Sequence, residues 1–458
     1  MNLKRKLGFD ILAEKYAYGE DPQYGHTSEQ KIPDHWVSTT CGYCSVGCGM
    51  SIGVKDGHAV SVRGNENHPV NLGKLCLKGL SEHYTLEASN RAKYPLLKKN
   101  GKLVPVSWDE ALHTMVEKFR ATQERYGPDA LGVLSTGQLV TEEFYALGKL
   151  VQLGFGTKNY DGNTTLCMAS AVSGYKRSFG SDGPPGAYED LQKADVIFLI
   201  GANIADNHPI LCQHLDANPR KTLIVADPRV TKTAMMADLF LPLKPRSDIA
   251  LLNGLIYLLI RTGQIDCEYI AKHTNGFAEL ARFVEKYTPT YVAQITGLSE
   301  DLIIKTADLY GSAQAALIGW TMGVNHSTQG AETVNAINNL ALITGNIGRA
   351  GASPFSITGQ CNAMGTREAG FASSLPGYRK FENAEDREQL GRLWKVDPDR
   401  IPTSRGLAYP DIVEAAVGKK IRALWIIATN PIVSFPNLDV LKQGLETLEF
   451  LVVQDGFH

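Results

Sequence analysis

Four of the eight cysteines lie in one segment near the N-terminus, where their spacing could hold an inorganic cluster. Three of them fall within eight residues and the last follows 27 residues later: Cys41, Cys44, Cys48 and Cys76. Three closely spaced thiolates can bind three corners of one compact iron-sulfur cluster, and the fourth binds the remaining corner when the chain folds back. Zinc is the alternative, but zinc sites usually take two separated cysteine pairs. The spacing therefore favours a [4Fe-4S] cluster.

Lys78 lies two residues beyond the fourth cysteine, in the string Leu75-Cys76-Leu77-Lys78-Gly79. A cation beside an anionic cluster would raise the reduction potential of the cluster and could connect it to a second redox centre. A solvated surface position is the commoner fate of a lysine. Without a second cofactor, the residue itself favours the solvated position.

Two later segments contain a possible metal ligand and a possible anion-binding residue. Cys167 follows polar residues 163–165 and precedes an alanine-rich, helix-prone stretch, and a helix N-terminus stabilises a thiolate. A buried, unreactive cysteine is the commoner alternative. Arg367 lies in the polar loop 358–368, and its planar donors suit a small oxyanion. The alternative for Arg367 is a surface ion pair with Glu368.

The elements that must position these residues are read from hydrophobic patterning. After residue 100 the chain alternates short apolar runs with longer amphipathic stretches, which is typical of a parallel sheet flanked by helices. A helix is expected after Ser107, because Ser107-Trp108-Asp109-Glu110 resembles a capping box. Residues 375–410 predict an irregular surface segment. The expected strands are 131–134, 196–200, 222–225, 316–318, 424–427 and 448–453.

Each expected strand ends in polar or glycine residues. In open α/β sheets, ligands bind beyond the carboxyl ends of the strands. Neither a GxGxxG fingerprint nor a GxxxxGK[ST] loop is present, and ordinary loop chemistry explains any single ending. Six such endings in one chain favour a large, nucleotide-like ligand. The endings are residues 135–138, 201–203, 227–229, 322–325, 429–430 and 454–455.

Composition excludes several classes of protein. With 458 residues, 43% hydrophobic and 21% charged, the chain is expected to form about two to four globular domains. A net charge of -2 gives no support for binding nucleic acid. The longest strongly apolar stretch, 249–260, is shorter than the roughly 20 residues of a membrane span and predicts a core helix.

The first 20 residues contain neither the apolar core of a signal peptide nor a twin-arginine pair. We therefore expect a cytoplasmic protein. In that reducing compartment, clustered cysteines are more often metal ligands than disulfides.

Together these motifs resemble those of the bacterial molybdopterin oxidoreductases, which bind molybdenum through two molybdopterin guanine dinucleotides. Within that family the chain is most similar to the monomeric assimilatory and periplasmic nitrate reductases. His326 departs from the pattern, since periplasmic relatives carry glutamine there. The resemblance runs from about residue 36 to the end and is carried by the cysteine spacing with residues 76–79, and by residues 167–172, 201–203, 208–209, 320–325 and 353–367.

The resemblance implies an α/β fold with a small N-terminal iron-sulfur domain, followed by two doubly wound, Rossmann-like domains. The implied boundaries are 36–95 for the [4Fe-4S] domain, 96–165 with 355–458 for one dinucleotide-binding domain, and 166–354 for the second. Because the sequence stops at Phe457-His458, the C-terminal β-barrel domain of the family is expected to be missing.

The resemblance also implies roles for individual residues. The [4Fe-4S] cluster would be held by Cys41, Cys44, Cys48 and Cys76, and Lys78 would lie between the cluster and the nearer pterin. Cys167 would be the protein ligand to molybdenum. The dinucleotides would be lined by Lys78, Gln138, Asn163, Cys167, Gly201, Asn203, Asp227, Ser247, Asp248, Met322, Gly323 and Asn430. The residues implied in catalysis are Cys167, Met168, Arg367, Gln360 and Lys78.

The residue after the metal ligand helps to separate reactions in this superfamily, since formate dehydrogenases place histidine there and these nitrate reductases place methionine. Met168 therefore favours nitrate, because formate oxidation needs a group that handles a proton and a thioether cannot do so. The implied reaction reduces nitrate to nitrite, with Arg367 orienting the substrate.

Electrons would come through the cluster from a ferredoxin, a flavodoxin or a pyridine-nucleotide-linked reductase subunit. Two alternatives stay open: a formate dehydrogenase on the same scaffold, and a non-catalytic electron-relay subunit. Retention of Cys167 together with Arg367 argues against the relay subunit.

Overall fold

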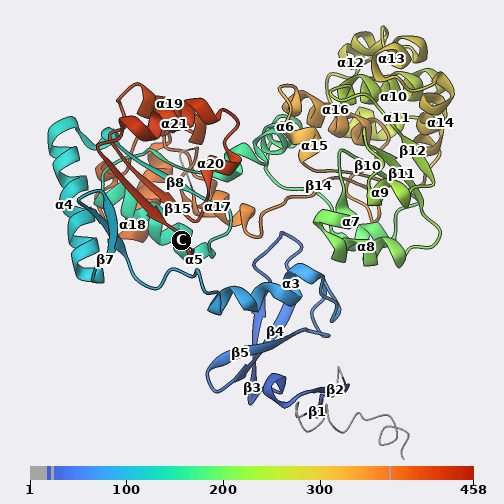
Figure 1. The fold of residues 1–458 in the computed structure, drawn as a ribbon. Coiled ribbons are helices and arrows are strands. Elements are labelled where there is room, and N and C mark those ends of the chain that lie inside the picture. The colour runs from blue at the N-terminus through green and yellow to red at the C-terminus, as the bar shows by residue number, and fades with distance from the viewer. Residues whose placement is uncertain (1–17, 22–24, 371–372, 458) are drawn as a thin grey trace, which may run out of the picture. The chain divides into compact units, whose positions relative to one another are not determined.

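The computed structural model describes residues 18–21, 25–370 and 373–457, and the chain divides into two compact units (Figure 1). Unit 1 spans Met1–Lys93 with Gly456–His458, and unit 2 spans Tyr94–Asp455. Within the described ranges, no helix combines the length and the apolar character that crossing a bilayer requires.

Unit 1 is built on a three-stranded antiparallel sheet in the order β3-β4-β5. Its strands are β3 (His35–Thr40), β4 (Gly49–Lys55) and β5 (His58–Gly64). A tight turn at Asp56 and Gly57, both with positive φ, joins β4 to β5. The short helix α3 (Leu77–Ser81) follows the sheet. The loop between β3 and β4 and the start of α3 therefore carry all four clustered cysteines.

The first sheet of unit 2 has five parallel strands in the order β12-β11-β10-β13-β14. Alternate residues of β10 join a core to which four helices each contribute two or more buried residues, as the two-residue period of a strand requires. The strands are β10 (Val196–Ile200), β11 (Thr222–Ala226), β12 (Leu239–Leu241), β13 (Ala316–Trp320) and β14 (Ser353–Ser356). The helices are α6 (Ala169–Phe179), α10 (Asp248–Thr262), α14 (Glu300–Gly311) and α16 (Gly330–Ile343).

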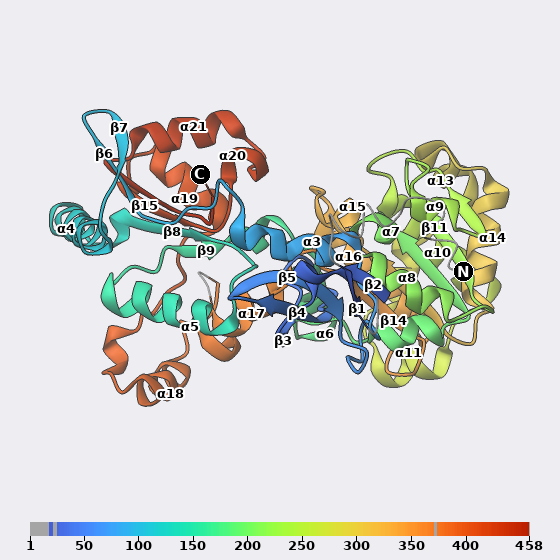
Figure 2. The same cartoon turned by 60° about the horizontal axis from the view of Figure 1, so that its bottom comes forward.

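The second sheet of unit 2 has four parallel strands in the order β16-β15-β8-β9. Leu134 of β8 packs with α19 and α21, whereas its neighbour Val133 packs with α5, so the sheet is covered on both faces (Figures 1 and 2). The strands are β8 (Leu131–Ser135), β9 (Tyr160–Gly162), β15 (Ala423–Ile427) and β16 (Phe450–Gln454). The covering helices are α5 (Thr141–Lys149), α19 (Tyr409–Val417) and α21 (Leu438–Thr447).

Both sheets are doubly wound, because the strand that comes first in the chain lies in the interior of the sheet. In the first sheet β10 lies between β11 and β13, and in the second β8 lies between β9 and β15. The expected α/β fold with two doubly wound sheets is thereby confirmed. Each sheet has a switch point where the chain changes direction, between β10 and β13 and between β8 and β15. Ligands of such sheets bind beyond the carboxyl ends of the strands at these points.

All six runs expected as strands are strands, although 448–453 is shifted because Leu448 caps the preceding helix α21. Residues 249–260 lie inside α10, as expected for a core helix. The Ser107 side chain caps α4 (Trp108–Tyr126) by accepting the backbone N–H of Glu110. The Glu110 carboxylate instead pairs with Lys99, 2.5 Å from its Nζ.

The expectation of an irregular surface segment over 375–410 is wrong in part. This segment contains helix α18 (Ala384–Trp394), which begins at an asparagine cap. Its apolar side chains form a small buried cluster of their own: Leu375, Phe381, Leu390, Trp394 and Ile401. The apolar pattern of this core is hard to recognise in the sequence because α18 carries mixed charges on its outer face.

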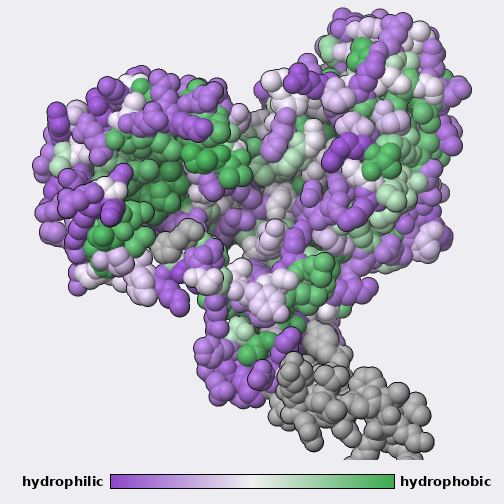
Figure 3. Space-filling model, viewed as in Figure 1, coloured by the Kyte–Doolittle hydropathy of each residue, from purple (hydrophilic) through white to green (hydrophobic). Residues whose placement is uncertain are grey.

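The strand β16 forms one edge of the second sheet, and among the described residues no further strand pairs with it on the outer side. Its side chains Leu451 and Val453 are 40% and 60% exposed. Figure 3 shows an apolar area on the part of unit 2 where Figure 1 places β15 and its neighbours. The edge of the second sheet therefore presents apolar side chains to solvent.

Asp161 is a buried carboxylate that joins β9 to α19. Its Oδ2 accepts hydrogen bonds from Thr165 Oγ1 and from the backbone N–H of Tyr409, both at 2.7 Å. Burial raises the pKa of Asp161 to about 6, and these hydrogen bonds limit the rise. The carboxyl group therefore holds its proton more tightly in the folded chain than in the unfolded chain, where its pKa is about 4.

We expect Asp161→Asn to change how stability depends on pH. Asp161 contributes stability that is full below about pH 4 and is lost as the pH rises through about 6, an effect on the order of 3 kcal/mol. The amide does not titrate, so the free energy of unfolding of the variant should rise relative to the unchanged protein between pH 4.5 and 7.5. Urea unfolding across this range measures the difference. Asp216→Asn, at an exposed position, is the control, and parallel pH curves for Asp161→Asn would contradict the prediction.

Candidate functional site

The cysteine loop of unit 1 is closed by its own backbone. Cys41 and Cys48 stand at the two ends of the loop, and the Cys41 N–H donates to the Cys48 carbonyl at 2.9 Å. Gly47 adopts a φ of +71°, which favours glycine, and its N–H donates to the Cys44 carbonyl at 3.4 Å. The backbone therefore turns tightly enough to bring three thiols to one side of unit 1.

Asn71 ties this loop to the segment that carries the fourth cysteine. Its buried side chain accepts the Gly49 N–H at 2.8 Å and donates to the carbonyls of Gly49 and Lys74, both at 2.9 Å. Cys76 then forms the N-cap of α3. No local pattern predicts this role, because an asparagine in a polar loop is usually assigned to a turn.

Electrostatics indicates that the four thiols share one environment. Burial raises the pKa of both Cys41 and Cys48 to about 12, and for Cys48 the charges of Cys44 and Cys76 add to the rise. Burial also raises the pKa of Cys44, against which the Lys78 ammonium acts. Such thiols ionise only when a metal cation compensates their charge. The four cysteines thus fit an iron-sulfur cluster, whose iron supplies that compensation.

Among the described residues, no three His, Cys, Asp or Glu side chains lie close enough together to hold one metal ion. A cubane cluster does not require such convergence, because each thiolate binds a separate iron. Lys78 lies in the same neighbourhood, with Nζ 5.1 Å from the centre of the Tyr43 ring. Its position between the cluster and a pterin stays a prediction.

At the switch point of the first sheet, two loops meet at Gly201 after β10 and Gly323 after β13. The carbonyl of Gly201 accepts Thr321 Oγ1 at 2.7 Å and the Gly323 N–H at 3.1 Å. A Cβ on Gly323 would lie 2.6 Å from the Gly201 Cα, and Gly201 itself has a φ of +57°. Only glycine fits at these two positions, both of which the sequence had indicated for the cofactor.

Acceptor groups gather at the carboxyl end of β11. Asp227 is buried and accepts the Arg229 N–H at 2.8 Å. Burial raises the pKa of Asp248, the first residue of α10, and the nearby charge of Asp227 adds to the rise. Two neighbouring carboxylates suit the N–H donors of a guanine base. Ser247 lies beside them, with its hydroxyl donating to the Lys244 carbonyl at 2.5 Å.

Asn203, which follows β10, is already paired within the protein. Its amide nitrogen donates to Asp206 at 2.8 Å, and its amide oxygen accepts Thr233 Oγ1 at 3.0 Å. The side chain is therefore held in place at the switch point. Its contact with a dinucleotide stays a prediction.

At the switch point of the second sheet, a chain of amides crosses from one strand end to the other. Gln360 Nε2 donates to Asn163 Oδ1 at 2.5 Å, and Asn163 Nδ2 donates to Thr429 Oγ1 at 2.9 Å. Gln360 Oε1 is buried and accepts no hydrogen bond from the described residues. A buried acceptor without a donor costs free energy, so this position fits the N–H groups of a pterin. Gln138 and Asn430 are exposed at the same strand ends.

Cys167 lies between a 3-10 turn (Asn163–Leu166) and α6, for which Met168 is the N-cap. Its Sγ is 3.5 Å from the Met322 Sδ. Burial raises the pKa of Cys167, whereas the Gly359 N–H and the Arg367 charge act in the opposite direction. Desolvation therefore has a larger effect on the pKa of this thiol than the groups that favour its thiolate. A metal cation would reverse this balance.

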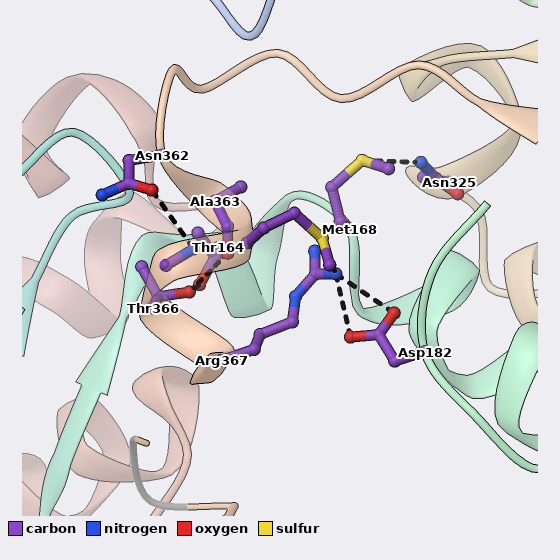
Figure 4. Close-up of polar contacts among 10 residues, drawn as sticks. Thr164, Met168, Asp182, Asn325, Asn362, Ala363, Thr366 and Arg367 are labelled. Carbon is purple, nitrogen blue, oxygen red and sulfur yellow. Dashed lines mark hydrogen bonds and ion pairs between the residues drawn. The ribbon is translucent and has the colours of Figure 1, made fainter. Parts of the chain in front are cut away.

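Arg367 of α17 (Ala363–Ala369) is paired with Asp182 rather than with Glu368 (Figure 4). Arg367 Nη1 lies 3.1 and 3.0 Å from the two carboxylate oxygens, and the two side chains are 16% and 2% exposed. The same nitrogen lies 3.2 Å from Met364 Sδ. The sequence analysis missed Asp182, which lies in a glycine- and proline-rich loop with no pattern to mark it.

Met168 is buried beside this ion pair, and Figure 4 shows its thioether directed toward Asn325. The structure therefore brings Cys167, Met168, Met322 and Arg367 into one neighbourhood, although α15 (Met322–Asn325) and α17 follow Cys167 by more than 150 residues. Asn325 lies in the polar strand ending expected at 322–325, but its contact with Met168 was not predicted from the sequence.

Two family models match the chain. "Molybdopterin oxidoreductase Fe4S4 domain" matches residues 34–87, and "Molybdopterin oxidoreductase" matches residues 91–458. The first match resolves the choice between iron-sulfur and zinc for the cysteine loop. The expected cofactors, a [4Fe-4S] cluster and molybdenum with pterin dinucleotides, are thereby confirmed.

Relatives that are named for different activities match almost the whole chain. A nitrate reductase of Synechocystis sp. is 41% identical over 433 residues, covering 92% of this chain and 60% of the relative. The F420-dependent formate dehydrogenase subunit alpha of Methanocaldococcus jannaschii is 36% identical over 424 residues, covering 92% of this chain and 61% of the relative.

Among solved structures, acetylene hydratase from Pelobacter acetylenicus has the same fold, with a TM-score of 0.74 and 24% identity, over 92% of this chain and 60% of that one. The chain thus spans about 60% of the length of these proteins. By the two family matches, which together cover nearly all residues from 34 onward, the chain belongs to the molybdopterin oxidoreductase family.

Proposed function

We propose that this protein reduces nitrate to nitrite, with electrons delivered through the [4Fe-4S] cluster of unit 1. The observation that carries the proposal is the grouping of Cys167, Met168 and the Arg367 guanidinium at one position in unit 2. The reaction consumes nitrate, two electrons and two protons, and it yields nitrite and water. Names of relatives such as the Synechocystis nitrate reductase support the same reaction.

Each group of residues has a distinct part in this proposal. When bound, the molybdenum-pterin group supplies a metal that exchanges two electrons with an oxyanion. Cys167 would hold the metal through its thiolate, and Gln360 with Asn163 would hold a pterin. Asp227 and Asp248 would hold a guanine base. Lys78 would assist electron transfer from the cluster.

Arg367 would orient nitrate. Its guanidinium offers planar donors to an oxyanion, and the buried Asp182 carboxylate fixes its direction. Because that carboxylate offsets much of the positive charge, an anion would be held weakly enough to leave as nitrite. Met168 offers an apolar, polarisable wall beside the metal ligand and no proton-accepting group.

Formate oxidation is the second candidate, and the identity to the Methanocaldococcus jannaschii protein favours it. Formate must lose a proton as well as two electrons, so its oxidation needs a base near the metal. Met168 provides none. A non-catalytic relay subunit is disfavoured, because such a subunit has no use for a metal ligand at Cys167 or an anion guide at Arg367.

We also propose an electron-donor protein as partner, either a ferredoxin, a flavodoxin or a pyridine-nucleotide-linked reductase subunit. A thiolate cluster near the surface of a small unit suits one-electron transfer from such proteins. The cytoplasmic location expected from the sequence stays a prediction.

The direct test measures molybdenum, pterin and iron in the purified protein and then compares two reactions. With a reduced viologen dye as donor, nitrate should be converted to nitrite in stoichiometric amounts. With an oxidised dye as acceptor, formate should give no turnover. Formate turnover without nitrate turnover would overturn the substrate assignment, and iron without molybdenum would overturn the assignment as an enzyme.

Cys167→Ala should abolish nitrate reduction, because the metal loses its protein ligand, whereas loss of a group behind such a ligand typically costs only about 10- to 100-fold. The electron paramagnetic resonance signal of the reduced [4Fe-4S] cluster should be unchanged, since its cysteines lie in unit 1. Cys212→Ala, which removes a half-buried thiol from α8 (Pro209–Asp216), is the matched control. Loss of both the activity and the cluster signal would contradict the assignment of Cys167.

Arg367→Lys should raise the KM for nitrate roughly 10- to 100-fold, since a charged hydrogen bond is worth about 1.5–3 kcal/mol and lysine lacks the planar donors. Steady-state assays over a range of nitrate concentrations measure the change. Arg177→Lys alters an exposed pair with Glu332 and should leave the KM unchanged. An unchanged KM in Arg367→Lys would remove Arg367 from the nitrate site.

A further inference from the structure

Helix α15 contacts both residues of the Cys167-Met168 pair. Its first residue, Met322, places Sδ 3.5 Å from the Cys167 Sγ, and its last residue, Asn325, places Nδ2 3.1 Å from the Met168 Sδ. Met168 and Asn325 are 3% and 4% exposed. One turn of helix, more than 150 residues away in the sequence, therefore fixes the metal ligand and its neighbour together.

The orientation of the Asn325 amide is set by Trp320. The indole Nε1–H of Trp320 lies 3.2 Å from Asn325 Oδ1 and is fully buried. An indole N–H can only donate, so the amide oxygen must face it. The amide nitrogen must then face the Met168 sulfur, which is a weak acceptor. Trp320, Asn325 and Met168 thus form a directed chain of hydrogen bonds.

The backbone that carries Asn325 is held at both ends. Ser170, in the first turn of α6, donates from Oγ to the Asn325 carbonyl at 2.8 Å. The start of α15 is held by the hydrogen bonds of Thr321 and Gly323 to the Gly201 carbonyl. The Asn325 backbone is therefore held in place, so Asn325 determines the position of the Met168 thioether and not the reverse.

We propose that Asn325 is a positioning residue that holds the Met168 thioether in one conformation beside Cys167. The proposal rests on the proposed function, because it assigns to Met168 a part in forming the nitrate pocket. A methionine side chain has three rotatable bonds and adapts readily to an irregular space. Without the amide, the thioether occupies several conformations, of which only a fraction leaves the pocket open for nitrate.

The test uses the loaded enzyme with 13C-labelled methionine methyl groups, of which the chain has eight. The Met168 resonance is assigned by its absence in Met168→Leu. In Asn325→Leu, which keeps the volume but removes the amide, this resonance should shift and broaden. The kcat/KM for nitrate should fall roughly 3- to 10-fold, in proportion to the lost fraction of the competent conformation.

Two further variants distinguish the loss of the hydrogen bond from a loss of folding. Asn325→Asp keeps the shape and removes the donor, and Trp320→Phe keeps an aromatic ring and removes the indole N–H together with some buried volume. Both should move the Met168 resonance in the same direction. Asn335→Leu is the matched control, because Asn335 of α16 also donates to the α6 segment but contacts Gly174 and Ser178 instead of Met168. It should leave the resonance and kcat/KM unchanged.

An unchanged Met168 resonance in folded Asn325→Leu would overturn the proposal, as would an equal change in Asn335→Leu. A shifted resonance with unchanged kcat/KM would overturn the role in catalysis. If the unchanged enzyme turns over formate and not nitrate, the proposed function fails. In that case the resonance, which needs no substrate, still decides whether Asn325 positions Met168.

Discussion

The backbones at Gly201 and Gly323 approach each other more closely than any side chain would allow, and the placement of the sulfur-bearing residues depends on that approach. It joins the ends of β10 and β13, which are neighbouring strands at the switch point of the first sheet. Because α15 begins directly after this contact, the same constraint places Met322 beside Cys167 and Asn325 beside Met168. A Cβ at either glycine would push the loops apart and separate α15 from Cys167.

Burial of thiols without compensating charge is the second constraint, and both cofactor sites share it. Desolvation raises the pKa of Cys167 as it does that of Cys41 and Cys48. None of these thiols would be ionised at neutral pH in the protein alone. The positive charge of a bound metal would stabilise their thiolates. Cofactor binding must therefore release protons and stabilise the fold together. Exposed thiolates would instead be open to oxidation.

Sequence patterning was sufficient for the central strands, because runs such as 196–200 are apolar throughout and end in glycine or polar residues. It could not find β9, β12 or β14, since three or four residues leave too little periodicity to read. The cysteine ligands were predictable because three of them are local in sequence. Asp182 and Asn325 were not, because each acts through one contact with a residue more than 150 positions away. No local pattern encodes such a contact.

Relatives named for different reactions share most of this chain's sequence range, which bears on what determines the substrate. Proteins with nitrate reductase and formate dehydrogenase names each match 92% of the chain, at 41% and 36% identity. The shared scaffold therefore specifies the cofactors and not the substrate. Under the proposed function, the side chains around Cys167 would distinguish the two reactions. Asp182 holds Arg367 and Asn325 contacts Met168, so these two residues limit the positions that Arg367 and Met168 can take.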